Sequence, residues 1–243
     1  MGAVILTMAG ESARFAKAGI STPKWALRVG DRSILGRAID SIGPYRQSGW
    51  KLVLVVREDH ATTPAFAEAI NDIEGYFRVV TLEATPQGQA LSACAAASAV
   101  EMGDPLAVWC ADTALLPGPD PIGLLGGNWI TLADLPGEQW SFAEVDDEDY
   151  VVRTAEKRRI SPHASVGLYG FRSMLTMQLA TGESRINKEV FVAPLYNSLV
   201  HDGIPVRALH IPAERVVPLG TPAEVVASCA RMGWSLPKEM QRA

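Results

Sequence analysis

The sequence predicts an α/β protein in which helices cover both faces of a mostly parallel central sheet, a Rossmann-like three-layer sandwich. Its first half alternates short apolar runs with helical patterns, the order expected of a parallel sheet with right-handed crossovers. Residues 52–56 form a continuous apolar run rich in valine, typical of a strand covered on both faces. The 243 residues, 48% of them hydrophobic, suffice for one large domain with a sizeable core.

The expected elements alternate in order along the first half. Strands are predicted at residues 4–8, 52–56, 77–82 and 106–110, and helices at residues 33–42, 65–70 and 89–101. In the first helix an apolar stripe lies on one face, and either Asp31 or Ser33 is suited to cap its start. Ligands of such sheets bind beyond the carboxyl ends of the strands. The loops after residues 8 and 110 are therefore candidate parts of a site.

The second half has a different pattern. Residues 140–145 and 150–154 flank the acidic turn 146–149, which is typical of a β-hairpin. A further strand is predicted at residues 166–171, and helices at residues 188–201 and 222–232, the last with a proline in its first turn. The composition shift at residues 117–119 marks a boundary within one domain and not a linker to a separate domain. We therefore expect a single domain, residues 1–243, with a small hairpin subregion and with halves at 1–116 and 117–243.

Charge and cysteine content narrow the classes of partner. The formal net charge of −5 argues against a general nucleic-acid binder, although a local Arg and Lys cluster can still hold a small anion. The three cysteines are odd in number and lack metal-binding spacing, which favours a reducing cytoplasm. The start lacks a basic signal-peptide region, and the longest weakly polar run, 90–100, is too short to cross a bilayer. We expect no nucleic-acid or membrane partner.

The loop after the first predicted strand contains residues suited to binding phosphate. Small residues that lead from a strand into a helix present backbone N–H groups to phosphate oxygens, and Arg14 and Lys24 add positive charge. The loop is neither a P-loop nor a GxGxxG loop. Asp112 follows the strand 106–110 and has the carboxylate that Mg²⁺ prefers. From these residues alone, a lone Arg and a lone Lys are usually solvated surface residues, and Asp112 could simply cap the turn that follows its strand.

Several motifs together resemble one enzyme family. Ala9-Gly10, Arg14-Phe15, Gly19 and Pro23-Lys24 are similar to the signature loop of the sugar nucleotidyltransferases, or NDP-sugar pyrophosphorylases. The other matching stretches follow in the family's order: Gln87 to Ala90, Cys110 to Asp112, Glu156-Lys157, Ser165 to Phe171, Glu189, Tyr196-Asn197 and Leu219 to Pro222. The resemblance spans residues 3–226, and the short chain is similar to small capsule-biosynthesis members.

The resemblance implies a GT-A-like form of the fold and a reaction at the α-phosphate of an NTP. A phosphate oxygen of the acceptor attacks, and pyrophosphate leaves. The second pKa of a phosphate monoester is about 6, so the nucleophile is already ionised and requires no general base. The acceptor phosphate and the NTP are both anions, so positive side chains and Mg²⁺ should supply most of the stabilisation of the transition state.

The resemblance also implies a role for each site residue. Arg14 would grip the β- and γ-phosphates and the leaving pyrophosphate, and Lys24 would neutralise the α-phosphate, while Asp112 would hold Mg²⁺. The remaining site residues are Ala9, Gly10, Gln87 and Gly88 for the nucleotide, and Lys157, Gly167, Glu189, Tyr196 and Asn197 for the acceptor.

Plain structural explanations stay open for several of these residues. Gly88 can be an ordinary loop glycine, and Glu189 can be a first-turn carboxylate favoured by the helix dipole. Lys157 stands in a short basic run that is typical of a solvated face. Trp25 can be either an aromatic residue on the acceptor side or in a lid, or a residue of the core.

Three positions depart from the family pattern. Ser12 replaces a second loop glycine, and Glu11 puts a carboxylate beside the expected phosphates. Pro218 stands where many members carry an Asp that is a second metal ligand. Either the site uses one protein carboxylate, or Glu214 or Asp146 substitutes.

The base and the acceptor stay open. A hexose 1-phosphate is the family's default acceptor, and CTP with a phosphonate or a phosphorylated amide or amine is the alternative. Rival readings are a GT-A glycosyltransferase, whose Asp-x-Asp would have to be Asp147 and Asp149 in the hairpin turn, and a non-catalytic nucleotide-binding module. Of the three interpretations, only the nucleotidyltransferase requires pyrophosphate release. The sequence is compatible with a monomer and with a homo-oligomer.

Overall fold

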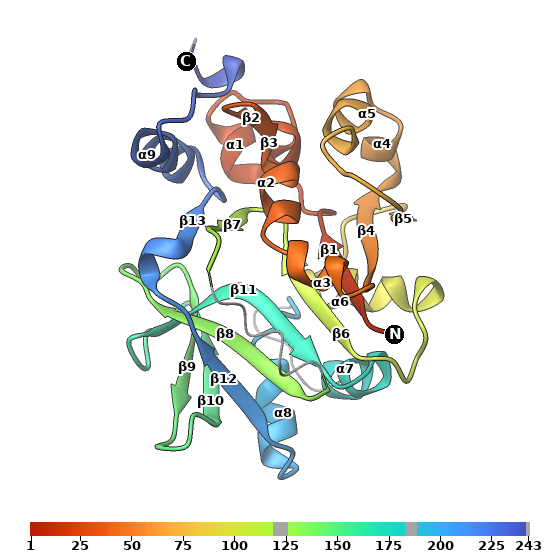
Figure 1. The fold of residues 1–243 in the computed structure, drawn as a ribbon, viewed down its shortest axis with the longest axis vertical. Coiled ribbons are helices and arrows are strands. Elements are labelled where there is room, and N and C mark those ends of the chain that lie inside the picture. The colour runs from red at the N-terminus through yellow and green to blue at the C-terminus, as the bar shows by residue number, and fades with distance from the viewer. Residues whose placement is uncertain (119–125, 183–188, 242–243) are drawn as a thin grey trace.

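A computed structural model describes residues 1–118, 126–182 and 189–241. In this part of the chain, nine strands form one sheet with seven in the order β10-β9-β11-β6-β1-β4-β5, and β8 joins β11 to β12 (Figure 1). The central strands β6, β1, β4 and β5 are mutually parallel, whereas β11 runs antiparallel to β6. The strands of this sheet are β1 Ala3–Thr7, β4 Lys51–Arg57, β5 Arg78–Leu82, β6 Leu106–Cys110, β8 Asn128–Asp134, β9 Ser141–Val145, β10 Val151–Glu156, β11 His163–Phe171 and β12 Val206–His210.

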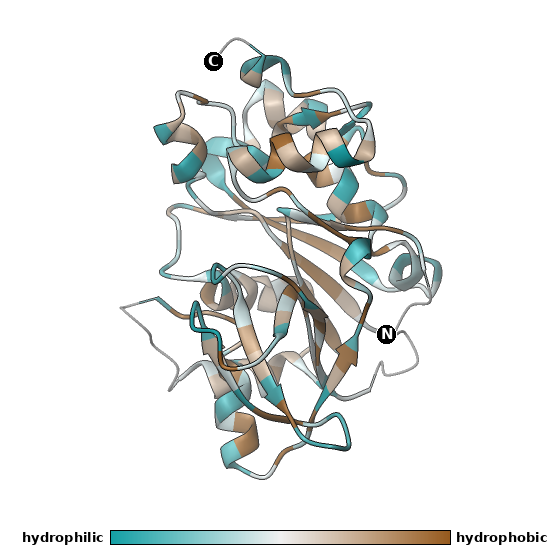
Figure 2. Ribbon diagram, turned by 90° about the vertical axis from the view of Figure 1, so that its left-hand side faces the viewer, coloured by the Kyte–Doolittle hydropathy of each residue, from teal (hydrophilic) through white to brown (hydrophobic). Residues whose placement is uncertain are grey.

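Helices cover both faces of the sheet, and this confirms the predicted three-layer sandwich. Along β4, Leu52 and Leu54 enter one core cluster with α2, α3 and α5, whereas Val53 and Val55 enter a second with α6, α7 and α8. Figure 2 shows the strands as a hydrophobic layer between more polar helices. The α-helices are α1 Ala13–Lys17, α2 Ile34–Asp40, α3 Gly43–Gln47, α4 Glu58–Ala61, α5 Pro64–Ile70, α6 Gln89–Cys94, α7 Met174–Thr181, α8 Leu195–His201 and α9 Pro222–Met232.

Short elements complete the framework around the main sheet. They comprise the 3₁₀ turns η1 Lys24–Ala26, η2 Ala95–Ala99, η4 Ala213–Arg215 and η5 Lys238–Met240, and the strands β2 Arg28–Val29, β3 Arg32–Ser33, β7 Thr113–Leu115 and β13 Val216–Pro218. β7 pairs with β13, and β2 pairs with β3.

The end of the chain packs back onto its beginning. Phe15 of α1 and Val225 of α9 belong to the same buried cluster, and Figure 1 shows α9 beside α1 and β2. The backbone N–H of Gly30 donates to the carbonyl of Ser235 at 2.9 Å. This packing brings residues near position 220 to the rim of the N-terminal half.

Local sequence signals explain several boundaries. Ser33 is the cap of α2 and accepts from the N–H of Gly36, which decides between the two candidate caps. Helix α9 spans the predicted residues, with Thr221 as its cap and Gly233 in the left-handed conformation at its end. The predicted hairpin is present as β9 and β10, whose turn is closed by N–H groups that donate to Asp146.

Two predicted helices are shorter than expected. The helix expected at 89–101 is an α-helix only as far as Cys94 and continues as the 3₁₀ turn η2 to Ala99. We expect a helix at 188–201, but α8 begins at Leu195, after Pro194; residue 188 lies outside the described residues. Just before it, the N–H of Val190 donates to the carbonyl of Gln87, and its carbonyl accepts from Ala90. These long-range bonds hold the segment extended, and the local pattern does not reveal them.

The sequence pattern does not reveal β8, β12 or α7. In β8 every residue but Asp134 is buried, so the strand shows no polar alternation. Of the described helices, none is both long and apolar enough to span a membrane.

Candidate active site

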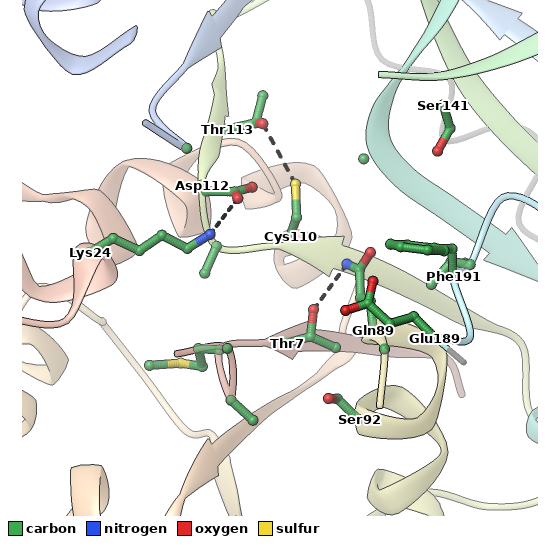
Figure 3. Close-up of a pocket in the computed structure, with 18 of the residues that line it drawn as sticks. Thr7, Lys24, Gln89, Ser92, Cys110, Asp112, Thr113, Ser141, Glu189 and Phe191 are labelled. Carbon is green, nitrogen blue, oxygen red and sulfur yellow. Dashed lines mark hydrogen bonds and ion pairs between the residues drawn. The ribbon is translucent and has the colours of Figure 1, made fainter. Parts of the chain in front are cut away.

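A cavity of about 790 Å³ lies at the carboxyl ends of β1 and β6. Its walls come from distant parts of the chain: the loop after β1, the segment before α6, the hairpin, β11, the segment before α8, and the loop between β13 and α9. Figure 3 shows Lys24 and Asp112 on one side of this cavity, with Glu189 and Phe191 on the other. Such a volume is typical of pockets for small molecules.

The loop after β1 is fastened to η1 through Ser12. Ser12 adopts a left-handed conformation with φ 53°, which is uncommon for a residue other than glycine. Its Oγ accepts a hydrogen bond of 3.1 Å from the backbone N–H of Lys24. Ser12 therefore adopts a backbone conformation that glycine favours and adds a side-chain link to Lys24.

Lys24 and Asp112 form an ion pair inside the cavity. Lys24 Nζ lies 2.6 Å from Asp112 Oδ2, and the two side chains are only 23% and 28% exposed. Burial alone would raise the pKa of Asp112. The Lys24 ammonium outweighs it and, with a smaller contribution from Arg14, holds that pKa below its usual value. Asp112 is therefore a carboxylate at neutral pH.

Arg14 lies at the same end of the cavity. It belongs to α1, its side chain is exposed, and it lines the cavity together with Lys24 and Asp112. A guanidinium, an ammonium and a carboxylate thus converge at the carboxyl edge of the sheet. Glu11 also lines this end, so an anion bound here would meet one carboxylate close to the two cations.

Trp25 is a core residue and not a lid aromatic. It is 1% exposed, and its ring makes edge contacts with Phe66 at 5.8 Å and His60 at 6.0 Å between centroids. Its burial holds η1 against the sheet and so positions the neighbouring Lys24.

Position 88 requires a glycine because the backbone of Val190 passes close to it. The φ of Gly88 is 112°, and a Cβ there would lie 2.3 Å from the carbonyl oxygen of Val190. Gln87 and Gly88 line the cavity, as do Ala9 and Gly10. These residues form one wall of small side chains and backbone that suits a flat or phosphate-bearing ligand.

Gly167 and Glu189 also line the cavity, Gly167 against Cys110 and Glu189 across from the ion pair. Gly167 has φ 91°, and a Cβ there would lie 2.3 Å from Cys110 Sγ. Glu189 is exposed to the cavity but precedes a non-helical segment. The helix-dipole explanation for Glu189 is therefore wrong. Burial raises the pKa of the Cys110 thiol, and the charge of Asp112 raises it further, so Cys110 is a neutral packing residue.

Glu156, Ser141, Tyr169 and Phe191 are lining residues that the sequence analysis does not single out. Ser141 donates to Glu156 Oε2, and burial raises the pKa of Tyr169. Glu156 is the first residue of the Glu-Lys motif, so that motif is a signal that could have found it. Tyr169 likewise lies within the matching stretch Ser165 to Phe171, whereas Ser141 and Phe191 reach the cavity only through the packing of the hairpin and of the segment before α8.

Lys157 lies at the rim of the cavity. Its Nζ is 3.6 Å from Glu156 Oε1 and 4.8 Å from the ring centroid of Phe191. Lys157 itself is half exposed and is not among the lining residues, whereas both of its partners are.

Tyr196 and Asn197 do not line the cavity, which corrects the prediction that they contact an acceptor. Tyr196 is fully buried, and its hydroxyl lies 2.6 Å from the carbonyl of Trp129 and 3.0 Å from that of Gly170. Asn197 accepts from the N–H of Thr154 and donates to its carbonyl. Both side chains join α8 to the sheet.

Glu224 lines the cavity near Asp112, and the sequence analysis does not include it. Neither of the proposed substitutes for the missing Asp does so. Asp146 accepts from its own turn, and Glu214 lies in η4 away from the lining. The sequence feature that could have identified Glu224 is its position in the first turn of the predicted helix 222–232.

The donor set fits a metal that arrives with a nucleotide. A Cβ on Gly220 would lie 3.1 Å from Asp112 Oδ2 and 3.3 Å from Glu224 Oε2, so two carboxylates flank one small space. Among the described residues no group of three or more His, Cys, Asp or Glu side chains is placed to hold a metal. Mg²⁺ is typically held by one or two carboxylates together with substrate phosphates.

A sheet whose central strands are parallel, with a cavity at their carboxyl ends, is an arrangement in which α/β proteins bind ligands. The family model of the MobA-like NTP transferase domain matches residues 3–188, more than half of the chain. The chain therefore belongs to the MobA-like NTP transferase family and is a nucleotidyltransferase. No curated protein matches it in sequence.

Solved structures share the fold over nearly the whole chain. A nucleoside-diphosphate-sugar pyrophosphorylase from Vibrio cholerae is 27% identical with a TM-score of 0.82, over 93% of this chain and 99% of that one. The inositol-1-phosphate CTP transferase from T. maritima is 17% identical with a TM-score of 0.73, over 91% and 90%. A UTP-bound UGPase from Acinetobacter baumannii is 18% identical with a TM-score of 0.75, over 100% and 96%.

Proposed function

We propose that this protein transfers a nucleoside monophosphate from an NTP to a small phosphorylated acceptor, a sugar 1-phosphate by default, and releases pyrophosphate. The observation that carries the proposal is the convergence of Arg14, Lys24 and Asp112 on one cavity at the carboxyl edge of the sheet. The family, whose members are NTP transferases, supports the same reaction.

In the proposed reaction the side chains act mainly by charge and position. Arg14 binds the β- and γ-phosphates and stabilises the charge that builds on the leaving pyrophosphate. Lys24 neutralises the α-phosphate as the acceptor oxygen attacks. No general base is required, because the acceptor phosphate is already ionised at neutral pH.

Mg²⁺ is part of the proposal. Asp112 would hold the ion, which when bound neutralises phosphate oxygens and favours departure of pyrophosphate. Lys24 contacts only Oδ2 in the free protein, so the ion would share the carboxylate with Lys24 or displace it towards the nucleotide. The 2.6 Å contact holds the two side chains together in the free protein.

We assign the nucleotide mainly to residues 1–116 and the acceptor to the hairpin, β11 and the segment around Glu189 within residues 117–243. Glu156 and Glu189 are acceptors of hydrogen bonds and suit the hydroxyl groups of a sugar. Lys157, at the rim, is placed to meet a phosphate. The free cysteines suit a reducing cytoplasm, where we place the reaction and its role in making activated precursors of capsule or other polysaccharides.

The proposal is tested by a matrix of the four common NTPs against phosphosugars, phosphocholine-like compounds and phosphonates, scored by pyrophosphate release. Release that depends on both substrates and on Mg²⁺ is expected for one NTP. A CTP-dependent signal with a non-sugar phosphate would identify the alternative acceptor class. Absence of release with every pair would leave the glycosyltransferase and the non-catalytic module and overturn the proposal.

Substitutions test the site itself. Asp112→Asn and Lys24→Ala are each expected to lower turnover about a hundredfold or more, because each removes charge stabilisation next to the reacting phosphate. Lys17→Ala in the same segment is the matched control, since Lys17 is exposed and does not line the cavity. Near-normal kcat in both site variants, with circular dichroism unchanged, would refute the assignment.

A further inference from the structure

We propose that Glu224 is the second carboxylate ligand of the metal and that it binds together with Asp112 across Gly220. The inference rests on the proposed function, because it assumes that a divalent cation enters this cavity with the nucleotide. It assigns a residue to the role of second metal ligand, which Pro218 cannot fill because its side chain has no ligand atom.

Gly220 marks the space between the two carboxylates. A Cβ at this position would lie 3.1 Å from Asp112 Oδ2 and 3.3 Å from Glu224 Oε2. Because one point is within reach of an oxygen of each side chain, an ion near that point can meet both. The absence of a side chain at position 220 keeps the space open.

The backbone around Gly220 is held firmly. Pro218 pairs with Thr113 across β13 and β7, and the N–H of Leu219 donates to the carbonyl of Asp112 at 2.8 Å. Pro218 also accepts from Ser228 Oγ of α9 at 2.7 Å. The loop therefore fixes α9 relative to the end of β6, and with it the position of Glu224 relative to Asp112.

Glu224 occupies the third position of α9. Thr221 caps the helix by accepting from the N–H of Glu224 at 3.2 Å. This bond uses the backbone of Glu224 and leaves its carboxylate to face the cavity. Within residues 1–118, 126–182 and 189–241, the carboxylate of Glu224 has no ion-pair or hydrogen-bond partner.

Charge explains why the second carboxylate is required. Asp112 is paired with Lys24, so the pair alone carries no net charge to attract a divalent cation. Glu224 adds a second carboxylate beside Gly220, and the two carboxylates then balance the two cations, Lys24 and Arg14, that line the cavity. Mg²⁺ can then be held while Lys24 turns to the nucleotide.

The test is Mn²⁺ binding, followed by electron paramagnetic resonance of the free ion, with Mn²⁺ alone and with the NTP that the pyrophosphate assay selects. Glu224→Gln is expected to weaken Mn²⁺ binding about tenfold or more. Gly220→Ala removes no carboxylate but fills the space, and the same loss is expected. Glu214→Gln, an acidic residue nearby in sequence but outside the cavity, is the control and should bind Mn²⁺ as the unaltered protein does.

A Glu224→Gln variant that binds Mn²⁺ with unchanged affinity would overturn the inference, and so would a Gly220→Ala variant with unchanged affinity. Thermal unfolding without metal checks that both variants are folded; if Glu224→Gln is not, Gly220→Ala carries the test. The two proposals fail differently. Without pyrophosphate release from the unaltered protein, the function is refuted, but weaker Mn²⁺ binding in the two variants would still support the carboxylate pair.

Discussion

At the scale of single residues, Ser12 combines a left-handed backbone with a side-chain hydrogen bond to the backbone of Lys24. Its left-handed backbone costs about 1–2 kcal/mol relative to glycine, and the bond from the N–H of Lys24 to its Oγ offsets part of that cost. Ser12→Ala keeps the backbone cost and loses the bond. We expect it to lower the free energy of unfolding by about 1 kcal/mol, measured by urea denaturation.

Ser12→Gly separates the two contributions. It removes the bond and also the backbone cost, so its free energy of unfolding should lie above that of Ser12→Ala. Its KM for the NTP should still rise, because Lys24 is no longer tied to the loop. Equal stability of the two variants would show that the left-handed backbone carries no cost here.

At the scale of elements, the short helix α4 supports the ion pair through His60. His60 packs against Trp25, and its pKa is lowered by burial, which outweighs the opposing charge of Asp59. The folded protein therefore binds this proton less tightly than the unfolded chain. Stability is lost as pH falls from about 6.5 towards the folded pKa, and is fully present above that window.

The expected result is that His60→Gln flattens part of the rise in unfolding free energy between about pH 5 and pH 7. Urea denaturation at several pH values measures it. His201→Gln is the control, because His201 is exposed at the end of α8 and should leave the slope unchanged. An unaltered slope in the His60 variant would contradict the burial argument.

Elements also show where sequence reasoning succeeds. The alternation of Leu52 to Val56 between two cores, and the start of α9 at Pro222, follow from local periodicity and capping. The late start of α8 does not, because the segment before it is held extended by bonds from Val190 to Gln87 and Ala90. Those partners are about a hundred residues away in sequence.

At the scale of the whole molecule, Tyr196 joins α8 to two strands of the sheet through the carbonyls of Trp129 and Gly170. Tyr196→Phe leaves both carbonyls without that donor and should lower the free energy of unfolding by about 1–3 kcal/mol. The KM for the acceptor should not change, because Tyr196 does not line the cavity. A large rise in that KM at unchanged stability would restore Tyr196 as an acceptor contact.

The sequence by itself determined the layered α/β fold, through the periodicity of short segments. The loop with Arg14 and Lys24, and Asp112 at the end of a buried strand, were selected as site candidates through motifs that resemble a known family. Only the tertiary structure decided that Trp25 and Tyr196 are buried and that Glu224, rather than Glu214 or Asp146, faces Asp112. The physical reason is that side chains from distant segments meet through the packing of α9 and α8 on the sheet, which no local pattern records.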